Sequence, residues 1–114
     1  MSGYGNRSSR PARAVPVQPS AVSWALKQSC GSPAHKLVLV TMAQLADGKR
    51  ECFPGARYLA DVAGITVTEA YEAIDTLRGI SLIARMGSKR ADGSGAIYRL
   101  AVDGPIEEPT EFLG

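Results

Sequence analysis

Basic side chains are the groups in this sequence whose type and position suit a binding chemistry. Lys89 and Arg90 are adjacent in the segment 87–95, which also contains three glycines. Two cations on a flexible segment can contact a row of phosphates, and such contacts supply affinity without base preference. Seven other basic residues lie near predicted loops, strands or helix ends and are further candidates for phosphate contact: Lys36, Lys49, Arg50, Arg57, Arg78, Arg85 and Arg99.

A second set of side chains suits contact with base edges. The segment 66–79 is predicted to be a helix, and the residues on its outward side are Val67, Thr68, Tyr71, Glu72 and Asp75. Threonine and tyrosine can hydrogen-bond a base or touch a thymine methyl group, and a carboxylate can accept from a cytosine amino group. The same segment is net acidic, and carboxylates that face phosphates cost affinity.

The prediction of this helix depends on its local pattern. Thr66 is a favourable N-cap, and Glu69 stands three residues later, which completes a capping box. Apolar residues then recur at helical spacing on one side: Ala70, Ala73, Ile74 and Leu77. Gly79 is placed to end the helix in a left-handed conformation.

A shorter helix is predicted directly before it. Gly55 follows Pro54 as the expected N-cap, Leu59 and Ala60 lie on the expected buried side, and Gly64 ends the helix. Only the pair Gly64–Ile65 then separates this helix from the cap of the next one. Two helices joined by a short glycine-containing turn have the spacing of a helix-turn-helix.

The remaining elements are predicted from caps and periodicity. A short helix over 20–27 carries Trp24, which we expect to pack over the core. A long helix over 32–47 begins with a serine cap and a proline at its first position, and should be the central buried helix. Residues 51–53 form a short extended piece, and the segments 82–86 and 96–100 are two strands around the basic glycine-rich loop.

These segments together resemble the winged helix-turn-helix domains of small bacterial, plasmid and phage regulators and replication proteins. The similarity covers residues 24–100 and rests on KLVLVTMA from Lys36, ECFP from Glu51, LADVAGI from Leu59, AIDTL from Ala73, LIAR from Leu82 and YRL from Tyr98. The resemblance implies a mainly α fold with a small antiparallel β-wing (α+β). It also implies a double-stranded DNA partner, with helix 66–79 in the major groove and the basic wing 85–99 on the backbone.

Charge and composition divide the 114 residues into three parts. Residues 1–19 are predicted to be a disordered basic arm with Arg7, Arg10 and Arg13, residues 20–102 the folded domain, and residues 103–114 a disordered acidic tail. No apolar run approaches a membrane span, so we expect a cytoplasmic, nucleoid-associated protein without membrane contact. Cys30 and Cys52 are too few for a disulfide framework.

The pattern favours binding over catalysis. The sequence has one histidine, no glycine-rich phosphate motif and no nucleophile beside a recognisable base, so we predict neither an enzyme nor a metal or cofactor site. The first hypothesis is a transcriptional regulator that binds DNA as a homodimer or in tandem. The alternatives are a protein–protein interaction module with an acidic recognition helix, and a replication-origin-binding or excision accessory factor.

Overall fold

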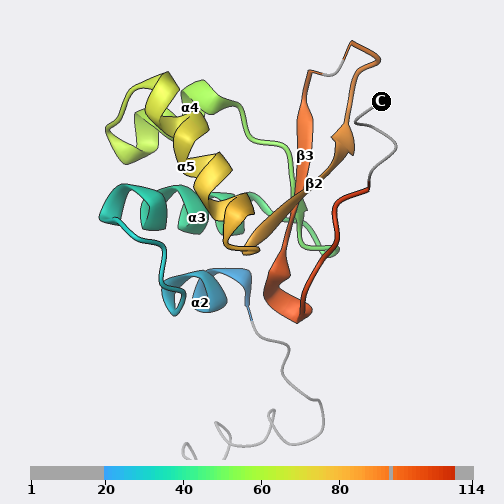
Figure 1. Ribbon diagram of the computed structural model, residues 1–114, viewed down its shortest axis with the longest axis horizontal. Helices are drawn as coiled ribbons and strands as arrows, with labels where there is room; N and C mark the ends of the chain where they lie inside the picture. Colours follow the sequence, from blue (N-terminus) through green and yellow to red (C-terminus); the bar gives the residue numbers. More distant parts are fainter. Residues whose placement is uncertain (1–19, 93, 110–114) are drawn as a thin grey trace, which may run out of the picture.

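Four helices pack beside a small sheet in the described part of the chain (Figure 1). The computed structural model describes residues 20–92 and 94–109, so the predicted arm with Arg7, Arg10 and Arg13 lies outside the described residues. The elements are α2 (Ala21–Leu26), α3 (Pro33–Leu45), β1 (Glu51–Cys52), α4 (Ala56–Ala63), α5 (Val67–Gly79), β2 (Ile83–Ser88), β3 (Ala96–Leu100) and the 3₁₀ turn η1 (Ala101–Asp103).

The sheet is antiparallel and has the strand order β1-β3-β2. Tyr98, in the middle of β3, pairs with Cys52 on one side and with Arg85 on the other. The β2–β3 register shifts between Arg85 and Gly87, and such a bulge increases the local twist of the hairpin. The predicted fold class, mainly α with a small antiparallel β-wing, is confirmed. The short extended piece predicted before α4 is β1, which joins the two strands of the hairpin in the sheet.

Helix α3 lies at the centre of the core. Its cap is as predicted: the Ser32 side chain accepts from the His35 amide at 3.1 Å, and Pro33 opens the helix. Three of its side chains are fully buried, Val38, Leu39 and Met42, and the helix packs against α2, α4 and α5. It ends at Leu45 instead of Asp47, because the Asp47 carboxylate turns back to accept from the amides of Lys49 and Glu51 at 2.8 and 3.0 Å.

Helices α4 and α5 form the predicted helix-turn-helix pair. Gly64 has φ 70° and ends α4 in the left-handed conformation, which glycine adopts without a steric penalty. The capping box of α5 is complete, since Thr66 Oγ1 accepts from the Glu69 amide at 3.0 Å and the Glu69 carboxylate accepts from the Thr66 amide at 2.9 Å. The buried ridge of α5 consists of the four predicted residues, Ala70, Ala73, Ile74 and Leu77.

The end of α5 differs from the prediction. Gly79 is still helical, and the left-handed residue is Ser81, with φ 65°. The Leu82 amide donates to the Leu77 carbonyl at 3.0 Å, so the reversal comes two residues after the glycine. This later reversal brings Leu82 against the core and lets Ile83 begin β2 as a buried residue. Tertiary packing therefore places the turn at a serine.

Replacing Ser81 with glycine should stabilise the fold. A non-glycine residue in the left-handed region costs about 1–2 kcal/mol, and the greater freedom of glycine in the unfolded chain offsets part of this. We expect Ser81→Gly to raise the free energy of unfolding by roughly 0.5–1 kcal/mol in denaturant titrations. Ser88→Gly is the control: Ser88 lies in β2 without a positive φ, so this change should lower stability.

The chain after η1 is more ordered than predicted. The acidic tail was expected to be disordered from Asp103 onward, but the structure places residues 103–109 and gives two of their carboxylates ion pairs. Asp103 pairs with Arg50 at 3.0 Å, and Glu108 pairs with Arg78 at 2.8 Å. The prediction is therefore corrected for residues 103–109, and its remainder, residues 110–114, lies outside the described residues. In the described ranges the longest helices, α3 and α5, have 13 residues each, and none has the length and hydropathy of a membrane span.

Candidate functional site

A groove separates α5 from the β2–β3 hairpin. It has a volume of about 850 Å³, and its third wall is the loop that leads into α4. Figure 1 shows β2 and β3 running past α5 toward the hairpin tip. The aromatic residues that line the groove are Phe53, Tyr71 and Tyr98, and the basic ones are Arg85, Lys89 and Arg90. No aspartate or glutamate is among the described residues that line it, so the groove suits an anionic ligand.

The cations of the hairpin extend into this groove. The Lys89 ammonium lies 3.8 Å from the centroid of the Phe53 ring, a cation–π contact across the groove. Arg90 donates from one guanidinium nitrogen to the Ser94 hydroxyl at 3.3 Å. Both side chains are exposed, and these two contacts hold them at the groove without neutralising them. They therefore remain available for a phosphate.

Local hydrogen bonds shape the hairpin tip. The Asp92 carboxylate accepts from the amide of Ser94 at 2.9 Å and from its hydroxyl at 2.7 Å, and these bonds lower the pKa of Asp92. Gly95 has φ 71°, and a Cβ there would lie 3.1 Å from the Lys89 Cβ. The glycine therefore permits the close approach that points Lys89 toward Phe53. The predicted basic loop is thus a defined turn at these residues.

The start of α4 forms part of the groove. Gly55 caps this helix without a side-chain hydrogen bond, and Gly55 and Ala56 line the groove. Free amides at a helix start favour an anion. Arg57 is exposed in the first turn of the same helix, as predicted. Lys89 and Arg90 are thus exposed candidate cations at the groove, and Arg57 is an exposed one at the adjoining start of α4.

The predicted base-contacting residues are all on the exposed face of α5. Val67, Thr68, Tyr71, Glu72 and Asp75 are exposed, and Tyr71 has 57% of its surface accessible. Only Tyr71 among them also lines the groove. The structure therefore brings Tyr71 of this face and the cations of the hairpin to the same groove.

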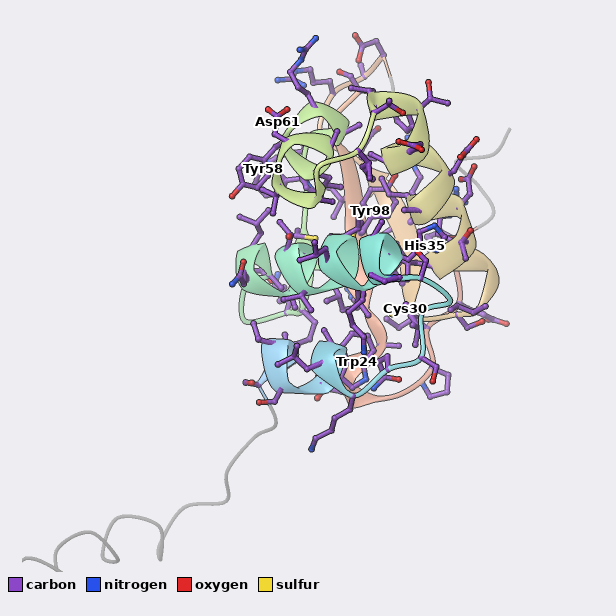
Figure 2. The ribbon with its side chains drawn as sticks, turned by 90° about the vertical axis from the view of Figure 1, so that its left-hand side faces the viewer. Trp24, Cys30, His35, Tyr58, Asp61 and Tyr98 are labelled. Atoms are coloured by element: carbon purple, nitrogen blue, oxygen red, sulfur yellow. The ribbon has the colours of Figure 1, made fainter. Side chains whose placement is uncertain are left out.

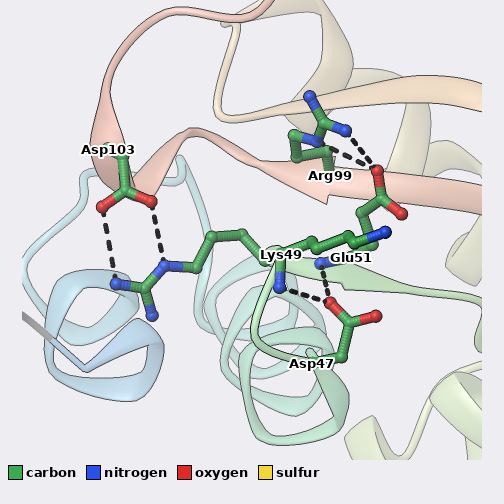
Figure 3. Close-up of polar contacts among 6 residues, drawn as sticks. Asp47, Lys49, Glu51, Arg99 and Asp103 are labelled. Carbon is green, nitrogen blue, oxygen red and sulfur yellow. Dashed lines mark hydrogen bonds and ion pairs between the residues drawn. The ribbon is translucent and has the colours of Figure 1, made fainter.

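Four of the other predicted phosphate contacts are engaged within the chain. Arg99 pairs with Glu51 across the β1–β3 register, with 3.0 Å between Nε and Oε2, and Arg50 pairs with Asp103 (Figure 3). These pairs lie at the Leu100 end of β3, opposite the hairpin tip. Lys49 is exposed nearby and contributes its amide to the Asp47 turn (Figure 3).

Lys36 is the third of these four residues, and it closes the end of α2. Its ammonium donates to the carbonyls of Ala25, Leu26 and Gln28, at 3.4 and 2.8 Å for the first two. A cation at a helix C-terminus satisfies carbonyls that have no partner within the helix. Lys36 therefore joins α2 to α3, and its role as a phosphate contact stays a prediction.

Arg78 is the fourth engaged cation, and it binds the ordered part of the tail. Its Nε and Nη2 each lie 2.8 Å from a Glu108 oxygen, and the Arg85 amide also donates to Glu108 at 2.9 Å. Arg78 also pairs with Asp75, three residues earlier in α5, at the longer distance of 3.8 Å. The hydrogen bonds from Arg78 lower the pKa of Glu108 to about 2, and they raise the pKa of Arg78.

The Glu108 contacts predict a dependence of stability on pH. A carboxyl whose pKa is lower in the folded chain stabilises the fold above its unfolded pKa, and this contribution disappears as pH falls toward the folded value of about 2. We expect Glu108→Gln to reduce stability by about 1 kcal/mol at neutral pH, because the pair is partly exposed. The difference from wild type should vanish near pH 2. Glu107→Gln, at the exposed neighbouring position, should match wild type at every pH.

The cysteines and the histidine make no comparable site. Cys30 and Cys52 are buried and unpaired with each other, and burial raises the pKa of the Cys52 thiol to about 12. His35 and Cys30 meet where α3 begins (Figure 2), with 3.3 Å between the His35 Nδ1 and the Cys30 carbonyl oxygen. In residues 20–92 and 94–109 no three His, Cys, Asp or Glu residues are placed to share a metal ion.

Sequence reasoning missed the aromatic lining of the groove. Phe53 has 56% of its surface exposed although it follows a buried strand residue. Tyr98 is buried in the centre of the sheet at the floor of the groove, and burial raises its pKa. The position of Phe53 directly before Pro-Gly, at a predicted helix start, could have indicated an exposed aromatic residue, because the core does not require one there. Nothing local distinguishes Tyr98 from an ordinary core residue.

One comparison with known proteins matches the helical part of this region. Residues 32–83 match a family model described as a helix-turn-helix domain. The matched segment runs from the cap of α3 to the first residue of β2 and therefore includes α4, the turn and α5. No curated protein and no solved structure matches the chain.

Proposed function

We propose, from the match of residues 32–83 to a helix-turn-helix domain, that the protein binds double-stranded DNA and acts as a transcriptional regulator. In this proposal α5 enters the major groove, and the hairpin contacts the flanking backbone. The observation that carries it is the position of Lys89 and Arg90 beside the exposed face of α5, across a groove without carboxylates. Phosphate contacts then fix the register in which the side chains of α5 meet the bases.

The acidic residues of α5 give the proposal a specific form. Glu69 is held by the capping box and faces the helix start, so it does not oppose the DNA. Glu72 and Asp75 are exposed, and each can accept from a cytosine amino group. Thr68 and Tyr71 supply hydroxyl groups on the same face. We propose that affinity comes mainly from the hairpin and Arg57, and that α5 contributes selectivity.

The size of the domain bears on how many copies bind the DNA. A single small module gives limited affinity, so we propose that the protein binds as a homodimer or in tandem on repeated sites. A phage, plasmid or other mobile element is the proposed source, and the nucleoid in the cytoplasm the proposed location. We propose that the protein acts by binding and has no catalytic activity. Origin binding and excision are alternatives that use the same surface.

Duplex binding should be salt-dependent. Fluorescence anisotropy with random-sequence duplex DNA at several salt concentrations should give an affinity that falls steeply and linearly on a log–log plot. Each phosphate contact contributes a slope of about 0.9, so three hairpin and α4 cations predict a slope of roughly 3 for each bound domain. Absent or salt-insensitive binding would contradict the proposal.

A second candidate function rests on the acidity of α5. Glu72, Asp75 and Asp61 of α4 are exposed carboxylates close to this helix pair, and Val67 and Tyr71 are exposed apolar side chains. Such a surface suits a basic protein partner, with the hairpin cations left for solvent. The same anisotropy series separates the two candidates, since a protein-binding module predicts no measurable duplex affinity.

A further inference from the structure

We propose that the groove between α5 and the hairpin binds an unpaired nucleotide, so that the protein prefers a duplex with an adjoining single strand. The inference rests on the proposed function, because the duplex must be held by α5 and the hairpin. Beyond the duplex, the inference names a second ligand group, an unpaired nucleotide. The juxtaposition that carries it is two exposed aromatic rings, Phe53 and Tyr71, among three cations and no carboxylate.

The size and lining of the groove suit a nucleotide. A volume of about 850 Å³ lies within the range of sites for small organic ligands. Phe53 and Tyr71 are each more than half exposed, and aromatic rings exposed together beside polar groups are typical of binding surfaces. Tyr98 adds an aromatic floor. A planar ring with an attached anion is the ligand that satisfies both the aromatic and the cationic lining.

The cations are placed for the phosphate of such a nucleotide. Lys89 covers the Phe53 ring from 3.8 Å, and its long side chain can move to a phosphate when a base takes its place on the ring. Arg90 lies beside it at the hairpin tip, and Arg85 lines the groove from β2. The Lys89–Phe53 contact shows that a face of this ring is open to a partner other than the core.

The nucleotide must be unpaired to use these rings. In a duplex both faces of each base are covered by its neighbours, and only the edges are accessible in the grooves. Stacking on protein aromatic side chains is therefore the mode of single-strand binding, and it depends little on base identity. A strand that leaves the end of a duplex bound to α5 can place its first free nucleotide in this groove.

The test compares three labelled ligands with the full chain: a blunt duplex, the same duplex with a short thymine overhang, and the same duplex with an abasic overhang. Overhangs on the 5′ and 3′ ends are measured separately. We expect one thymine overhang to bind about fivefold tighter than the blunt duplex or more, the lower end of what stacking one base contributes. The abasic overhang keeps the phosphates and should lose most of this gain.

Variants identify the groove as the site of the gain. Phe53→Ala should reduce the ratio of overhang to blunt affinity to about one. Tyr58 is an aromatic residue of similar exposure on α4 and is not among the groove residues (Figure 2). Tyr58→Ala should therefore leave the ratio unchanged. The circular dichroism spectrum of each variant checks that it is folded.

Three results would overturn the inference: equal affinity for blunt and overhanging duplexes, an abasic overhang as effective as thymine, or an unchanged ratio in Phe53→Ala. Equal affinities for the blunt and overhanging duplexes would indicate that the groove contacts the DNA backbone or another protein instead of an unpaired base. The blunt duplex tests the proposed function separately. If the protein shows no salt-dependent binding to the blunt duplex, duplex recognition is contradicted, whatever the affinity for the overhanging duplexes.

Discussion

Duplex affinity should fall at every DNA sequence when Lys89 and Arg90 are both replaced by alanine. The two side chains lie at the hairpin tip beside the groove, exposed and free of ion pairs with described carboxylates. Losing two phosphate contacts should reduce the log–log salt slope by about 2 and lower affinity on the order of tenfold to a hundredfold near 0.1 M salt. Anisotropy titrations with several unrelated duplexes measure both quantities.

The matched control removes the same charge from the far end of the molecule. Lys27 and Lys49 are exposed and lie outside the groove, so Lys27→Ala with Lys49→Ala should change the slope by much less than 1. An equal effect of the two double variants would indicate attraction by total charge alone. A change of preferred sequence in the hairpin variant would contradict its assignment to the backbone.

Replacing Leu77 with alanine should remove much of the stability of the domain. Leu77 is fully buried on the ridge that seats α5 on the core, beside Ala73 and Ile74. A buried leucine-to-alanine change costs about 2–5 kcal/mol, and a domain of this size has a total stability near the lower end of 5–15 kcal/mol. Denaturant titration followed by circular dichroism should therefore show a much lower midpoint, with part of the population unfolded at 37 °C.

Val67→Ala provides the comparison on the same helix. Val67 is exposed at the first turn of α5, so its replacement should change stability by at most about 0.5 kcal/mol. Equal losses at the two positions would mean that α5 is not seated on its apolar ridge. The outward orientation assigned to the predicted base-contacting residues would then be contradicted as well.

The parts of the structure that the sequence predicts are those that depend on near neighbours. The Thr66–Glu69 capping box, the Ser32 cap and the left-handed Gly64 each follow from residues at most three or four positions apart. The buried ridge of α5 follows from helical periodicity. A helix-turn-helix is therefore largely encoded in local signals, and the family match over 32–83 covers the same part of the chain.

The features that differ from the sequence-based prediction arise from contacts between residues far apart in the chain. Glu108 lies 30 positions from Arg78, and Asp103 lies 53 from Arg50, so no local pattern could assign these cations to carboxylates. The reversal at Ser81 is set by the packing of the next strand instead of by Gly79. The aromatic lining of the groove combines Phe53, Tyr71 and Tyr98 from three elements. The candidate site is thus predictable in its exposed helix face and hairpin cations, but not in its shape.

Docking of the tail also bears on binding. Glu108 occupies Arg78, the one basic residue in the last turn of α5, and places a carboxylate next to β2. The Glu108 carboxylate offsets the positive charge of Arg78 at this end of α5. The charge of Arg78, one of the predicted phosphate contacts, is therefore compensated within the chain.

The most direct measurement is an NMR titration of the ¹⁵N-labelled protein with duplex DNA. If α5 and the hairpin hold the duplex, the amides of residues 67–75 and 88–96 should shift together with the first turn of α4. The amides of α2 and of residues 99–106 should stay in place. Shifts confined to α2 and the Leu100 end of the sheet, or no shifts at all, would contradict DNA binding by this surface.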